Sequence, residues 1–88
     1  MDVIESIVKN ESVEDVLKVF ALNSGIPSLD IMFGRYRHEV RASGELINTY
    51  QRLFDEGVLQ SGPNGVAVKG PNWIEPKFLA DNKYGKAN

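Results

Sequence analysis

The chain has no cysteine and only one histidine, which removes most of the chemistry common in small catalytic and metal-binding proteins. Disulfides, thiolate nucleophiles and zinc sites of the usual cysteine–histidine type are excluded by count. A Ser-His-Asp triad would have to be built around His38, and Asp30 lies too many helical turns away to orient that imidazole locally. We therefore interpret His38 as a surface side chain on a charged helix, and predict no catalytic residue and no metal site.

A phosphate loop and a shared-proton carboxylate pair are also missing. The glycines at 62, 65 and 70 lack the GK[ST] ending of a phosphate loop, and they fall in a turn rather than before a helix. The adjacent acids Glu14/Asp15 and Asp55/Glu56 project about 100° apart on a helix, so we interpret them as solvated charges. We expect a protein that is not an enzyme and that binds no cofactor.

No apolar run approaches the roughly 18 residues that a membrane-spanning helix needs. The first residues, MDVIESIVKNE, carry acids where a signal peptide needs positive charge, so the expected location is the cytoplasm. A chain of 88 residues has room for one hydrophobic core and hence one domain.

Positive charge is scarce and unevenly placed in this chain, whose net charge is −2. Residues 1–34 carry six acids and two bases, whereas residues 35–41 (RYRHEVR) carry three arginines and one glutamate. Residues 42–57 carry three acids and one base. No long tract of a single sign is present, so neither a nucleic-acid-binding arm nor an acidic tail is indicated.

The most informative stretch runs from residue 43 to residue 70. Leu46, Ile47, Tyr50, Leu53 and Phe54 recur at helical spacing on one face. The helix is expected to stop at the glycine at 57, and the alternating valines at 66 and 68 predict the return strand of a hairpin. A helix followed by a hairpin is the order found at the end of a winged-helix domain.

Three further helices are expected before this stretch. Asp2 and Ser12 are placed to cap helices that end near residues 10 and 22. Ile26-Pro27 is expected to be extended, with Ser28 capping a third helix that continues to Val40. We predict a mainly α fold with a small β-hairpin (α+β), a winged-helix-like domain of three to four helices over residues 1–70.

The remaining residues, 71–88, contain too many prolines, glycines and asparagines for a regular element. They also contain Trp73, Phe78 and Tyr84, so we expect an irregular segment packed on the same domain. Trp73 then has two interpretations, a tail anchor or a hot spot for a partner.

The winged-helix order raises nucleic-acid binding as one functional hypothesis. In such domains the helix before the wing usually enters the major groove. The helix at 43–56 has a net charge of −2, which opposes binding to phosphates, and the arginines at 35–41 can meet a phosphate backbone or an acidic protein, or simply be solvated. Nucleic acid is therefore the alternative partner. Its candidate residues are Arg35, Arg37, Arg41, Asn48, Thr49, Gln51, Arg52 and Lys69.

Protein binding is the preferred hypothesis, because an acidic surface speeds encounter with a basic partner and selects for it. The same acids can also be merely solvated, so the candidates rest on charge and exposure alone. The candidate partner-binding residues are Glu11, Glu14, Asp15, Glu45, Arg52, Asp55, Glu56 and Trp73.

One segment supports this preference by resemblance. Residues 66–78, V-x-V-K-G-P-N-W-x-x-P-K-F, followed by Lys83-Tyr84-Gly85, resemble the C-terminal end of small bacterial immunity proteins. These accompany polymorphic toxins of the contact-dependent inhibition and Rhs kind. The resemblance implies a cytoplasmic, non-catalytic protein that binds and neutralises one cognate toxin, often a nuclease. It implies no particular fold and no contact residues. The chain is expected to be a monomer, or a homodimer formed through the tail aromatics.

Overall fold

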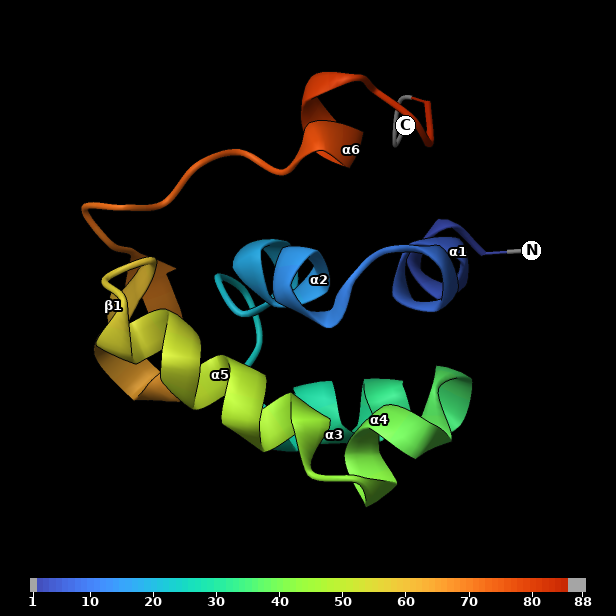
Figure 1. Ribbon diagram of the computed structural model, residues 1–88, viewed down its shortest axis with the longest axis horizontal. Coiled ribbons are helices and arrows are strands. Elements are labelled where there is room, and N and C mark those ends of the chain that lie inside the picture. The colour runs from blue at the N-terminus through green and yellow to red at the C-terminus, as the bar shows by residue number, and fades with distance from the viewer. Residues whose placement is uncertain (1, 86–88) are drawn as a thin grey trace.

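Six α-helices and one two-stranded antiparallel sheet make up residues 2–85, the part of the chain that the computed structural model describes. The predicted α+β class is therefore confirmed. Figure 1 shows α1 and α2 across the middle, with α3, α4 and α5 on one side of them and the C-terminal segment on the other. The elements are α1 (Val3–Asn10), α2 (Val13–Phe20), α3 (Ile26–Tyr36), α4 (His38–Ala42), α5 (Glu45–Asp55), β1 (Leu59–Ser61), the 3-10 turn η1 (Pro63–Gly65), β2 (Ala67–Lys69) and α6 (Lys77–Ala80).

The two N-terminal helices begin where their caps were predicted. The Asp2 carboxylate accepts a hydrogen bond from the Ile4 amide at 3.1 Å, and the Ser12 hydroxyl accepts one from the Asp15 amide at 3.1 Å. Each bond satisfies an amide that has no partner inside its helix. These two starts are thus fixed by residues adjacent in sequence.

The third helix departs from the prediction at both ends. It begins at Ile26, with Gly25 as its N-cap, so the expectation that Ile26-Pro27 is extended is wrong. Proline is tolerated in the first helical turn because its missing N–H would have no partner there. The helix also ends at Tyr36 instead of continuing to Val40, because Arg37 takes a non-helical conformation (φ −145°, ψ 69°) before α4 starts.

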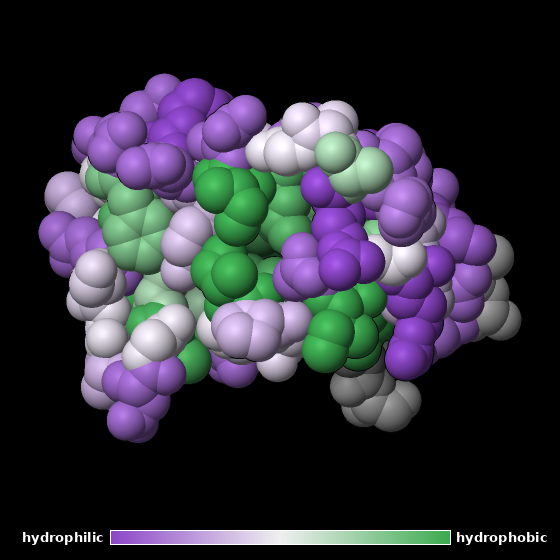
Figure 2. Space-filling view, turned by 90° about the horizontal axis from the view of Figure 1, so that it is seen from below, coloured by the Kyte–Doolittle hydropathy of each residue, from purple (hydrophilic) through white to green (hydrophobic). Residues whose placement is uncertain are grey.

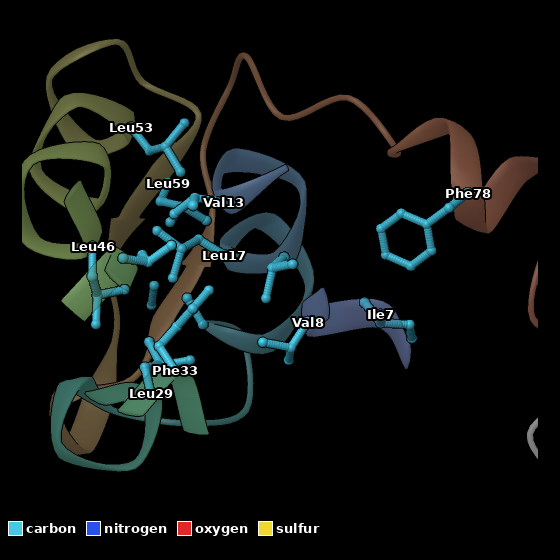
Figure 3. Close-up of a cluster of buried hydrophobic side chains, with 14 residues drawn as sticks. Ile7, Val8, Val13, Leu17, Leu29, Phe33, Leu46, Leu53, Leu59 and Phe78 are labelled. Carbon is cyan, nitrogen blue, oxygen red and sulfur yellow. The ribbon is translucent and has the colours of Figure 1, made fainter. Parts of the chain in front are cut away.

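The hydrophobic core forms where α2 meets α1, α3 and α5. Leu17 from α2, Phe33 from α3 and Leu53 from α5 are all fully buried, and Figure 3 shows their side chains converging between these helices. At the far end of the core, Phe78 from α6 points toward Ile7 from α1. The core therefore extends from the hairpin to the C-terminal segment.

The hairpin is short and closely joined to the helices. Leu59 pairs with Lys69, and Ser61 pairs with Ala67. The Ala67 amide donates a hydrogen bond to the Ala21 carbonyl at 3.1 Å, which fastens β2 to the end of α2. Gly57 has φ +75°, as its predicted role in stopping the preceding helix requires. These contacts hold the hairpin against the body.

The segment after the hairpin runs back over α2 and α1. The Trp73 indole donates a hydrogen bond from Nε1 to the Lys18 carbonyl at 2.9 Å, and Phe78 is buried. The expectation of no regular element is wrong at Lys77–Ala80, which form α6 with Pro76 as the N-cap. A proline is compatible with a helix that starts directly after it. Residues 86–88 of the predicted segment lie outside the described residues.

The contrast between two positions of α3 tests this packing. Phe33→Ala is expected to lower the free energy of unfolding by about 3–5 kcal/mol, because it empties a fully buried site. Ile31→Ala is the matched control; its side chain is 64% exposed, so a change within about 0.5 kcal/mol is expected. Urea denaturation measures both. Equal losses at the two positions would contradict the described core.

Candidate functional site

Helix α5 lies at the surface with a different neighbour on each flank. Its Leu46 and Leu53 are buried, and the helix packs against α2, α4 and β1. On the flank toward α2, the Arg52 guanidinium lies 2.7 Å from Glu14 and 3.1 Å from Glu56. Glu14, first among the causes, raises the pKa of Arg52 through the hydrogen bond that it accepts. The only cation of α5 is therefore paired with two carboxylates.

On its other flank α5 borders a groove of about 460 Å³, which we call the α5–hairpin groove. Apolar side chains from α5 form one wall, and the tip of the hairpin forms the other. The lining residues are Ile47, Tyr50, Gln51, Phe54, Asp55, Ser61, Gly62, Gly65, Val66 and Ala67.

The groove is mainly apolar and accessible. Ile47 is 49% exposed, and the rings of Tyr50 and Phe54 lie 4.8 Å apart between centroids. Burial raises the pKa of Tyr50. Figure 2 looks onto the side of the molecule formed by α3, α4 and α5, and hydrophobic residues gather across the middle of this face. This surface offers a partner apolar area beside an exposed helix.

Charge on the groove comes from one carboxylate. Asp55 is exposed and has no ion pair among residues 2–85, and the same holds for Glu45 at the start of α5. No lysine or arginine lines the groove. Its electrostatic character is therefore anionic.

The arginines predicted to meet phosphates do not form one free cationic surface. Arg37 donates to the Val8 and Glu11 carbonyls at 3.3 and 2.9 Å, so its guanidinium caps the end of α1. Arg41 is paired with Asp30 at 3.0 Å. Arg37 and Arg41 do not lie one turn apart on a continuous helix, because Arg37 takes a non-helical conformation between α3 and α4.

The other residues of the nucleic-acid hypothesis are dispersed. Arg35 is exposed on α3, and Lys69 on β2 lies over the Trp73 ring at 4.2 Å. On α5, Asn48 and Gln51 are exposed and Thr49 is half-buried. These side chains do not combine with the paired arginines into a continuous positive patch.

The predicted acidic residues likewise divide into separate groups. Glu14 and Glu56 meet at Arg52, and Asp55 lies on the groove. Glu11 lies elsewhere, where its carboxylate accepts hydrogen bonds from Lys83 at 2.7 Å and from Tyr84. Asp15 lies half-buried in the first turn of α2.

Two of the predicted contact residues have structural roles. The Glu11 carboxylate is largely enclosed by the C-terminal segment, with its side chain 12% exposed. Trp73 is half-buried and bonded to the Lys18 carbonyl, which supports the tail-anchor interpretation. Among the predicted contact residues, Glu45 and Asp55 of α5 are exposed and have no ion pair within residues 2–85.

The groove residues Ile47, Phe54 and Val66 were predicted as helix stripe and strand, and not as a site. One signal was present in the sequence: Ile47 projects about 100° away from Leu46 around the helix, so it lies at the edge of the apolar stripe. Which edge of the stripe stays open depends on where the hairpin folds back, which sequence spacing does not determine.

Two chemical possibilities can be assessed on the described residues. Within residues 2–85, no cluster of three or more histidines or acids is arranged to hold a metal ion. None of the helices described there has both the length and the apolarity required to cross a membrane. Comparison with protein-family models, with curated proteins and with solved structures finds no match to this chain.

The contact of Glu11 with the C-terminal segment predicts acid sensitivity. Burial raises the pKa of Glu11, but hydrogen bonds from Lys83 and Tyr84, together with the Lys83 charge, outweigh it and leave the pKa below its usual value. A lowered folded-state pKa contributes stability that is present above the unfolded pKa of about 4.3 and lost as pH falls through the folded pKa. Acid should therefore loosen the C-terminal segment.

Thermal unfolding followed by Trp73 fluorescence between about pH 7 and pH 3 measures this effect. The wild-type midpoint should fall more steeply on acidification than that of Glu11→Gln. Glu45→Gln removes an exposed carboxylate that has no ion pair among residues 2–85, and it should follow the wild type. Identical pH profiles for the wild type and Glu11→Gln would rule out this contribution.

Proposed function

We propose that this chain is a non-catalytic protein-binding module that binds and neutralises a cognate toxin in the cytoplasm. Two observations support the proposal. The sequence from residue 66 to residue 85 resembles small immunity proteins, and the surface offers an apolar groove beside an anionic helix. A stoichiometric inhibitor needs only a surface complementary to its target, so the proposal requires no catalytic residue.

The observation that carries the proposal is the state of Arg52. A helix that reads DNA needs cations free to meet phosphates, because phosphate contacts dominate affinity. Here the single cation of α5 is bonded to Glu14 and Glu56, and the remaining charges of the helix, Glu45 and Asp55, are negative. A basic protein surface complements this arrangement, whereas a phosphate backbone is repelled by it.

The residues that carry the resemblance have structural roles in this fold. Its residues fasten the C-terminal segment: Trp73 bonds to α2, Phe78 is buried and Tyr84 bonds to Glu11. Gly70 is required by packing, since a Cβ atom there would lie 2.1 Å from the Gly57 carbonyl oxygen. The resembling segment thus mainly supports the scaffold, while Val66 and Ala67 at its start line the α5–hairpin groove.

A winged-helix DNA-binding regulator is the second candidate, favoured by the order of α5 followed by the hairpin. In that reading the base edges would be contacted by Asn48, Thr49, Gln51 and Arg52, and Lys69 would lie on the wing. The ion pairs of Arg52 and the contact of Lys69 with Trp73 weigh against it.

Affinity capture from the native host tests the proposal. The tagged protein should recover one predominant protein, and light scattering should show a stoichiometric complex of the two. Expression of the captured protein alone should arrest growth, and co-expression of this chain should relieve that arrest. Resin carrying an unrelated acidic protein of similar size is the control. Recovery of host DNA with no specific protein would reject the proposal. A larger particle made only of this chain would reject it in favour of a homodimer.

A further inference from the structure

We infer that the α5–hairpin groove receives a basic amphipathic helix of the partner, with apolar side chains in the groove and a lysine or arginine against Asp55. This inference deepens the proposed function and rests on it. It assigns the recognition surface and the chemical class of the segment that is recognised. An amphipathic helix laid in an apolar groove is a recurring mode of peptide recognition.

The apolar wall supplies the contact area. Ile47 is 49% exposed, and Tyr50 and Phe54 are half-buried and packed on one another beside it. Burial of apolar surface contributes about 25 cal/mol per Å², and aromatic side chains are enriched among residues that dominate binding. Val66 faces the same space from the hairpin. An inserted leucine-sized side chain would therefore contact both walls.

The charge at the rim of the groove determines which sign of charge the bound partner segment must carry. Asp55 lines the groove without an ion pair among residues 2–85, and Gln51 and Ser61 provide further polar groups. A positively charged side chain beside the inserted residue satisfies this carboxylate, whereas an acidic segment is repelled. The same charge disfavours a second copy of this chain packed through α5, because each copy would present its own Asp55 and Glu45.

The groove is held open by the fold before any partner arrives. The Ala67 amide bonds to the Ala21 carbonyl, and the hairpin tip approaches α3 so closely that a Cβ atom on Gly25 would lie 3.4 Å from the Gly65 carbonyl oxygen. At Gly65 itself, a Cβ atom would meet nothing within 4 Å, so the space beside this residue is open. A preformed site avoids part of the ordering cost of binding.

A titration of the full chain with designed peptides tests the inference. The first probe is a helix of about 16 residues with leucines at positions i, i+4 and i+7 and lysines on its remaining face. The second replaces every lysine with glutamate, and the third keeps the lysines but carries serine for leucine. Amide chemical shifts of the labelled protein report where each peptide binds.

The leucine–lysine peptide should bind, and the largest shift changes should fall on α5 and residues 61–67. Ile47→Ser should weaken this binding about tenfold, equivalent to about 1.4 kcal/mol. Asp55→Asn should weaken it about two- to fivefold, as expected for an exposed charge pair. The matched controls are Ile31→Ser, an exposed isoleucine on α3, and Glu75→Gln, an exposed carboxylate of the C-terminal segment outside the groove; both should change affinity less than twofold.

The inference would be overturned if the leucine–lysine peptide did not bind, if the leucine–glutamate peptide bound equally well, or if the shift changes fell away from the groove. Equal binding of the lysine–serine peptide would reduce the interaction to charge alone and would also overturn it. The inference and the proposed function can fail separately. If a captured toxin binds the wild type and Ile47→Ser equally well, the proposed function stands and the groove is rejected as its recognition surface.

Discussion

Burial of the apolar face of α2 is the constraint on which the rest of the structure depends. Val16, Leu17 and Ala21 are fully buried, and α1, α5, β2 and the C-terminal segment all contact this helix. A chain this short buries only about 60–65% of its unfolded surface, so a single central helix must serve several neighbours. With α2 enclosed, α5 becomes an outer helix that packs against α2, α4 and β1 and leaves Ile47 and Asp55 exposed beside the hairpin. The open groove follows from that arrangement.

The same packing of helices determines which charged side chains form ion pairs. The side of α5 next to α2 brings Arg52 against Glu14, a residue 38 positions away in the sequence. Arg37 is used in a different way, as a donor to the carbonyls that end α1. Arg37 and Arg52 thus serve internal contacts, and the exposed carboxylates of α5 remain for a partner. This partition is why we favour a protein target over nucleic acid.

Local chemistry made much of the fold predictable. The caps at Asp2 and Ser12 and the turn at Gly57 depend on neighbours within four residues, and all three are confirmed. The break at Arg37 was not predictable in this way, because its guanidinium bonds to carbonyls 26 and 29 residues away. The start of α3 was misplaced because a proline suits both an extended segment and a first helical turn.

The candidate site was less predictable than the fold. The acidic and basic residues could be identified from the sequence, but their pairing depends on which helices become neighbours. Glu11 and Glu14 are three residues apart, yet one binds the C-terminal segment and the other binds α5. The apolar wall of the groove looked like core, since periodicity reports one face of a helix and does not show how much of that face is covered.

The central claim is that this chain's own carboxylates neutralise the cations that a DNA reader would need. Fluorescence anisotropy of duplex DNA at about 50 mM and about 200 mM salt tests this claim directly, with Glu14→Gln/Glu56→Gln as the variant that frees Arg52. The wild type should show no binding at either salt concentration, and the variant should gain at most weak binding at the lower one. Tight wild-type binding at about 50 mM that falls steeply by about 200 mM would contradict the account.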